Sequence, residues 1–157
     1  MRKLYSRLFI TCSIILASLF GNAQTDISIG TGTTGNTGTT YPAPLQDYFE
    51  GARSQYLYLA SELTAAGMSA GFITSVKFEV TNLNGTGIIE QFQLRIGETS
   101  TTSLASNSWS AFLGSTSTTP VMDYQPVVGM NTLSLTTPFY WNGRDNILIE
   151  ICNGDPA

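Results

Sequence analysis

Two short segments in the middle of the chain, residues 74–81 and 91–96, alternate between apolar and polar side chains. Their apolar members are Val76, Phe78, Val80, Phe92, Leu94 and Ile96. A period of two is typical of a β-strand with one buried face, whereas an amphipathic helix repeats every 3.6 residues. We therefore expect two strands whose apolar side chains face a common core.

Strand patterns cover most of the remaining chain. Further strands are predicted at residues 55–59, 120–128, 131–136 and 146–152. Residues 61–70 are rich in alanine but interrupted by glycine, which predicts a loop with at most a short helix that starts from a Ser61 cap. The expected fold class is therefore all-β, in one module over residues 41–157.

The connection between the two alternating segments constrains how they could pair. The Asn84–Gly85 pair is favoured in two-residue type I′ hairpin turns. Such a turn would place Phe78 opposite Gln91, an inward residue against an outward one. We therefore expect a hairpin whose loop holds an odd number of residues, with Lys77 and Gln93 on the same exposed face.

The first 23 residues have the three parts of a secretory signal peptide. A head with three basic residues precedes an apolar stretch over residues 8–20, and small residues ending at Ala23 form a cleavage site before Gln24. The stretch is shorter than the roughly 20 residues that span a bilayer. We expect removal of residues 1–23, a secreted or outer-surface location, and no membrane insertion of the mature chain.

The mature chain is expected to be acidic and to begin with a flexible segment. Removing residues 1–23 takes away three of the seven basic residues and none of the eleven acidic ones, so the net charge falls from −4 to −7. This balance disfavours nucleic acid as a partner, and no cationic cluster is expected to grip an acidic sugar. Residues 24–40, rich in threonine and glycine, predict a flexible lead-in.

The end of the chain suggests a fragment. Cys152, the one cysteine outside the signal, lies in the strand pattern of residues 146–152, five residues before the last residue. We expect that a further strand, and with it a partner cysteine, is missing from the C-terminus. The alternative is a free buried thiol at a true terminus, since free cysteine packs as a small hydrophobe.

The residues needed for common catalytic sites are absent from the sequence. The chain has no histidine, which removes Ser-His and Cys-His nucleophile arrangements. A pair of carboxylates could still act together, drawn from Glu62, Glu79, Glu90, Glu98 or Asp123. Scattered acids are better explained as solvated surface, so no catalytic site and no cofactor are expected within this chain.

Two local features are candidates for ligand binding. Asn142 and Asp145 gather oxygen atoms in a short loop, which makes calcium possible, although a plain turn is the favoured explanation. Trp109, Tyr140 and Trp141 are candidate sugar-binding or partner-binding rings. Most rings of a β domain belong to its core, and of the adjacent Tyr140 and Trp141 about one should face outward.

The assembled sequence resembles a known kind of module. The segments that carry the resemblance are residues 58–68, 73–78, 82–86, 137–143 and 146–152. They are similar to a repeated module of large secreted and cell-surface proteins from bacteria that use the type IX secretion system. The resemblance implies a jelly-roll-like antiparallel β-sandwich at the N-terminus of longer chains, and it implies no functional residues.

Two functions from different classes follow as expectations. The first is a non-catalytic secreted or cell-surface module for adhesion, which binds a surface glycan or protein. The alternative is an inert leading domain of a secreted hydrolase whose catalytic domain lies beyond residue 157.

Overall fold

The computed structural model describes residues 24–30, 43–49, 51–105 and 108–154. The predicted signal peptide, residues 31–40 of the predicted lead-in and residues 155–157 lie outside the described residues. The elements are β1 (Ala52–Tyr58), α2 (Ala60–Ala65), β2 (Gly71–Val80), β3 (Ile89–Thr99), β4 (Leu113–Thr118), β5 (Met122–Tyr124), β6 (Gly129–Trp141) and β7 (Asn146–Asn153).

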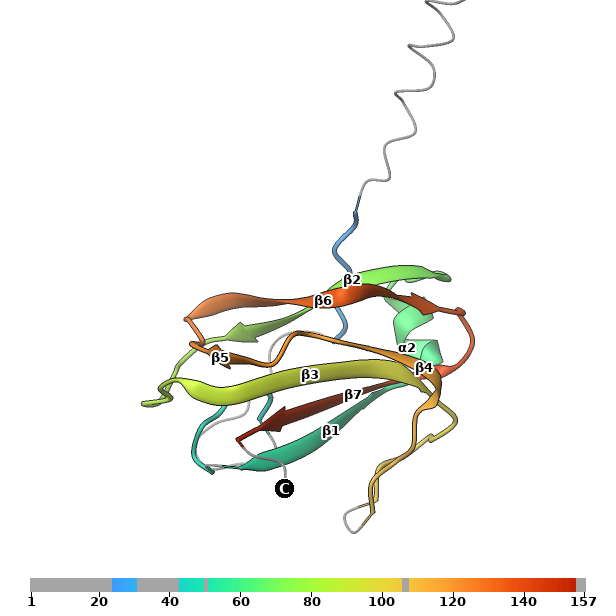
Figure 1. The fold of residues 1–157 in the computed structure, drawn as a ribbon. Helices are drawn as coiled ribbons and strands as arrows, with labels where there is room; N and C mark the ends of the chain where they lie inside the picture. Colours follow the sequence, from blue (N-terminus) through green and yellow to red (C-terminus); the bar gives the residue numbers. More distant parts are fainter. Residues whose placement is uncertain (1–23, 31–42, 50, 106–107, 155–157) are drawn as a thin grey trace, which may run out of the picture.

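The strands form two layers, which lie one above the other in Figure 1. The large sheet has five strands in the order β1-β7-β3-β4, with β5 also paired to β3, and the small sheet consists of β2 and β6. Every pairing is antiparallel. The predicted all-β class is confirmed, with a sandwich-like arrangement.

The core lies between the two sheets. Its buried side chains from the strands are Ile89, Phe92, Leu94, Ile96, Leu133, Phe139, Trp141, Ile147, Ile149 and Ile151. The alternating segment on β3 therefore faces inward as predicted. Val76 and Phe78 on β2 also pack against this core, but they remain half-buried.

The predicted hairpin between β2 and β3 is wrong, because the two strands belong to different sheets. Phe78 on β2 is opposite Asn131 on β6, whereas Leu94 on β3 is opposite Ile151 on β7. The connection still contains a tight turn at Asn84–Gly85. Both residues have positive φ, 51° and 88°, and the Thr86 N–H donates to the Leu83 carbonyl at 2.9 Å. These are features of a type I′ turn, which here leads from one layer to the other.

The strand boundaries differ from the prediction in the second half of the chain. Of residues 120–128, only Met122–Tyr124 forms a strand. The strand Leu113–Thr118 was not predicted, because its glycine, serine and threonine residues carry no apolar alternation. The predicted strand over residues 131–136 extends to Trp141.

The Ala-rich segment contains a short helix, α2, whose N-cap is Leu59, two residues before the predicted Ser61 cap. A Glu62 Oε2 atom accepts a hydrogen bond from the Leu59 N–H at 2.8 Å, which satisfies a backbone donor at the helix start. Leu63 is the buried residue of α2 and belongs to the core, and the segment turns at Gly67 with φ 91°. In the described part of the chain, no helix is both long and apolar enough to cross a membrane.

Strand β7 lies between β1 and β3 and is buried on both of its faces. Ile147, Ile149 and Ile151 face the core, as their alternation predicts. The residues between them point to the outer side of the large sheet, yet Leu148 is 0% exposed and Glu150 only 3%. Other residues of the chain therefore cover the outer face of the large sheet at this strand.

Candidate functional site

A buried carboxylate tied to two arginines lies on the outer face of the large sheet. Glu150 Oε2 accepts hydrogen bonds from Arg53 Nη2 at 2.7 Å and Arg53 Nε at 3.0 Å. Gln55 Nε2 donates to the same oxygen at 2.9 Å, and Arg95 Nη1 lies 3.6 Å from Glu150 Oε1. A buried charge is costly without such partners, and Glu150 has three.

The strand register brings these residues together. Glu150 on β7 is directly opposite Gln55 on β1 and Arg95 on β3, and Arg53 is two residues before Gln55 on the same face of β1. Because side chains alternate across a strand, all four point to the outer face. Residues 53, 95 and 150 are far apart in sequence, so only the pairing of β1, β7 and β3 makes them neighbours.

The last residues of the connection between β3 and β4, residues 109–112, lie against this outer face, and described parts of the connection extend below the large sheet in Figure 1. Gln55 fixes it by two reciprocal hydrogen bonds: its Nε2 donates to the Ser110 carbonyl at 3.0 Å, and its Oε1 accepts from the Ser110 N–H at 2.9 Å. The Thr99 hydroxyl donates to the Ala111 carbonyl at 2.8 Å. Residues 109–112 are therefore held at a defined position on the sheet.

Each arginine lies against a ring of this connection. The Cζ of Arg53 is 4.3 Å from the centroid of the Trp109 ring, and the Cζ of Arg95 is 5.7 Å from that of Phe112. Phe112 fits here because Gly97 has no side chain: a Cβ at this position would lie 2.6 Å from Phe112 Cδ1. Each of the two rings thus contacts a guanidinium group that forms an ion pair with Glu150.

We call this surface the arginine–tryptophan face and define it by Arg53, Gln55, Arg95, Trp109, Phe112 and Glu150. Trp109 is 55% exposed, and the side chains of Arg53 and Arg95 are 42% and 44% exposed. The face presents two guanidinium groups and one buried carboxylate, a local charge of +1. No cationic cluster was expected from the sequence, yet two of the four basic residues that follow residue 23 meet here.

Cys152 also points to this outer face. It is opposite Arg53 on one side and Gln93 on the other, and it is half-buried and free. Burial raises the pKa of its thiol, Glu150 raises it further, and the two arginines lower it. The net upward direction disfavours the reactive thiolate, so the geometry gives Cys152 no nucleophilic role.

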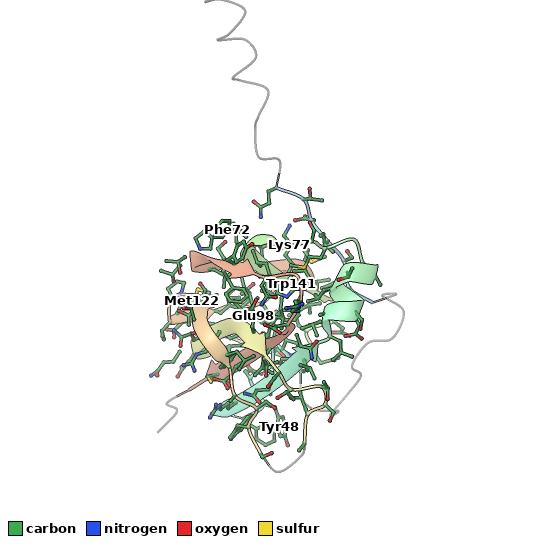
Figure 2. All side chains as sticks on the ribbon, turned by 90° about the vertical axis from the view of Figure 1, so that its right-hand side faces the viewer. Tyr48, Phe72, Lys77, Glu98, Met122 and Trp141 are labelled. Atoms are coloured by element: carbon green, nitrogen blue, oxygen red, sulfur yellow. The ribbon has the colours of Figure 1, made fainter. Side chains whose placement is uncertain are left out.

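Trp141, one of the three candidate rings, lies in the core. Its side chain is 0% exposed, and its Nε1 donates to the Asp145 carbonyl at 2.8 Å. Figure 2 shows it in the interior, whereas Phe72 and Lys77 lie at the upper surface. Trp141 is therefore not accessible to a ligand, and its neighbour Tyr140 is the one of the pair that faces out.

Tyr140 belongs to a second exposed aromatic surface, on the outer face of the small sheet. Tyr140 and Phe72 are 54% and 72% exposed, and their rings make an edge contact with centroids 5.3 Å apart. A shallow depression of about 600 Å³ over the same two strands is lined in part by Thr74 and Lys77. The Lys77 ammonium is bound there by Asp26, at 2.5 Å.

The loop considered for calcium has the contacts of a turn. Asn142 Oδ1 accepts from the backbone N–H groups of Arg144 and Asp145, at 2.8 and 2.9 Å, and Asn142 Nδ2 donates to Asp145 Oδ2 at 2.7 Å. Gly143 has φ 76°, as the turn requires. Among the described residues, no three His, Cys, Asp or Glu side chains gather in a way that could hold a metal ion.

Several scattered carboxylates have structural roles. Glu62, Glu98 and Asp123 each accept a hydrogen bond from a backbone N–H, those of Leu59, Asn142 and Gln91. Gln91 has φ 50° at an irregularity between β3 and β5, so Asp123 stabilises an unusual backbone conformation there. These carboxylates are thereby explained by their backbone partners.

The comparisons with known proteins assign no family to this chain. No protein-family model, no curated protein and no solved structure matches this chain.

Proposed function

We propose that this chain is a non-catalytic binding module of a secreted or cell-surface protein and that it binds glycans at Trp109. One observation carries the proposal: Trp109 is an exposed indole that the fold holds in place. Sugar rings stack their C–H faces on such aromatic surfaces, and a fixed ring loses little conformational freedom when it does so.

The fixation of Trp109 follows a chain of contacts that ends in the sheet. Arg53 lies against the indole, Glu150 holds Arg53, and Gln55 holds both Glu150 and the backbone of Ser110 beside the ring. Trp109 keeps 55% of its surface exposed despite these contacts. A ligand ring would meet a surface whose position is set before binding.

Tyr140 is the weaker candidate, although it is equally exposed. Its ring and that of Phe72 are inclined by 66°, so they form no common plane on which a sugar could lie. The exposed cation of β2, Lys77, is five residues along the strand from Phe72, and its charge is already paired with Asp26. Glycan binding is therefore assigned to the large sheet.

Export and adhesion are inferred from the sequence. The signal-peptide pattern and the resemblance to modules of type IX secretion bacteria support a place outside the cell. The alternative, an inert leading domain of a secreted hydrolase, predicts that the chain binds no glycan by itself.

The test is a glycan array probed with the mature chain and two matched variants. Trp109→Ala should reduce binding by at least tenfold, because it removes the stacking surface. Tyr140→Ala removes a ring of similar exposure on the other sheet and should leave binding unchanged. The melting temperature of each variant checks that the fold is retained.

Two results would contradict the proposal. Loss of binding in Tyr140→Ala with retention in Trp109→Ala would move the site to the small sheet. Absence of binding to every glycan by the wild-type chain would favour the inert domain.

A further inference from the structure

The arginine–tryptophan face carries more than a stacking ring, and its charges indicate which sugars it would select. We infer that it binds oligomers of uronic acids, with one sugar stacked on Trp109 and the carboxylate of a neighbouring unit on Arg53 and Arg95. The inference rests on the proposed function and specifies its ligand class.

The exposed groups of this face are cationic, and its anionic group is hidden. Glu150 is 3% exposed, whereas the side chains of Arg53 and Arg95 are 42% and 44% exposed. A ligand on the surface therefore meets guanidinium groups without close approach to the carboxylate. An anionic ligand would be attracted locally even though the chain as a whole is acidic.

The guanidinium groups also keep donors for a ligand. Arginine has five N–H groups in a planar fork. Arg53 directs Nε and one N–H of Nη2 at Glu150 Oε2, which leaves three N–H groups, two of them on Nη1. Arg95 approaches Glu150 only through Nη1, at 3.6 Å, a distance beyond an ordinary hydrogen bond. A carboxylate fits such a fork in a planar, bidentate way.

Both arginines are held in position before a ligand arrives. Each lies against a ring of the same connection, Arg53 against Trp109 and Arg95 against Phe112. The long arginine side chain normally loses much rotamer freedom on binding, and here part of that loss occurs on folding. Both cations are thus positioned before an anion binds.

The position of Arg53 indicates an oligomer and excludes a single sugar as the preferred ligand. Because Arg53 occupies one face of the indole, a sugar must stack on the opposite face of Trp109. The carboxylate of that same sugar would then be separated from Arg53 by the ring. A second unit of the chain can extend over the sheet and place its carboxylate on the guanidinium groups.

The experiment compares each polyuronate with its carboxyl-reduced form, which has the same backbone without the charge. The probes are oligomers of galacturonate, alginate and hyaluronan, their reduced forms, and galacturonic acid as the monomer, measured by calorimetry at low salt. We expect at least one oligomer to bind tenfold or more tightly than its reduced form. The monomer should bind at least tenfold more weakly than the oligomer.

Three variants separate a local from a general charge effect. Arg53→Gln and Arg95→Gln should each remove the preference for the uronate over its reduced form. Arg144→Gln makes the same change of charge in the turn before β7 and should leave the preference intact. Arg95→Gln is the variant less coupled to folding, because its contact with Glu150 is the longer one.

The outcomes distinguish the inference from the proposed function. Equal binding of the charged and reduced forms, lost in Trp109→Ala, overturns the inference and leaves glycan binding at Trp109 standing. Binding of neither form, nor of any array glycan, overturns both. Equally tight binding of dextran sulfate would show simple anion attraction and overturn the assignment to uronates.

Discussion

The central strands of the large sheet and strand β2 of the small sheet face one core but differ in how completely their inward side chains are buried. In the large sheet, β3 and β7 each have neighbours on both sides, and their inward residues Leu94 and Ile149 are 0% and 4% exposed. In the small sheet, β6 buries Leu133 completely, but β2 pairs, among the described strands, only with β6, and its inward residue Phe78 is half-buried. A strand with two neighbours is covered along both edges, which β2 is not.

The outer faces of the two sheets also differ, in how their exposed aromatic rings are held. The outer face of the large sheet carries Trp109, which Arg53 and Glu150 connect to three strands. The small sheet exposes Phe72 and Tyr140, whose described ring contact is with each other. The comparison teaches that exposure alone is a poor criterion for a binding ring. Trp109 and Tyr140 are equally exposed, but of these two rings Trp109 is the one that contacts a group of a hydrogen-bonded network in the described part of the chain.

The largest expected effect tests the inner faces. Leu94→Ala should lower the free energy of unfolding by about 2 to 5 kcal/mol, because it leaves a cavity in a close-packed layer. Phe78→Ala should cost less, about 1 to 2 kcal/mol, since its side chain is partly solvated already. Urea unfolding of both variants measures the difference. Equal costs would show that the two sheets are packed equally well.

A smaller effect tests how firmly the β3–β4 connection is fixed. Gly97→Ala places a methyl group against Phe112 and Thr116, which must move, at a cost of about 1 to 3 kcal/mol. Gly51→Ala is the control: a Cβ there meets nothing within 4 Å, and stability should change by no more than about 0.5 kcal/mol. If Gly97→Ala were as stable as Gly51→Ala and the wild type, Phe112 would not rest on the sheet.

The smallest effect concerns Tyr56 on β1, whose ring centroid lies 6.4 Å from that of Phe78 on β2. Burial raises the pKa of Tyr56 to about 12, against the lowering effect of its hydrogen bond with Ser54. A raised folded pKa stabilises the fold below pH 10, and this contribution is lost as the pH rises from 10 to 12.

Urea unfolding between pH 9 and pH 12 measures this loss. Tyr56→Phe should weaken the alkaline decline without abolishing it, because burial also raises the pKa of Tyr58. Parallel curves for the variant and the wild type would show that Tyr56 is not desolvated in the fold.

The sequence was sufficient for those features that depend on local pattern. Alternation identified β3, β6 and β7 and the inward direction of Leu94, because side-chain parity is fixed within a strand. It failed for Leu113–Thr118, whose pairing with β3 depends on backbone hydrogen bonds and not on apolar residues. It also failed for the order of strands, since β2 and β3 are consecutive but belong to different layers.

The site was less accessible to prediction. Trp109 was singled out as a ring, but nothing in its sequence neighbourhood indicates Arg53, which is 56 positions earlier. Glu150 interrupts an isoleucine-rich strand, and this single buried-strand acid was the available signal that a cationic partner must lie across the sheet. The strand register decides which cations lie beside Glu150, and periodicity alone does not give the register.

The measurement that tests the central claim most directly is a two-dimensional ¹⁵N NMR titration of the two indole N–H groups. The chain has two tryptophans, so each has its own assignable signal, and Trp141 serves as an internal control because its indole N–H is bound within the core. On titration with the tightest-binding oligouronate, the Trp109 signal should move progressively while the Trp141 signal stays in place. Binding detected by calorimetry with an unmoved Trp109 signal would contradict the account.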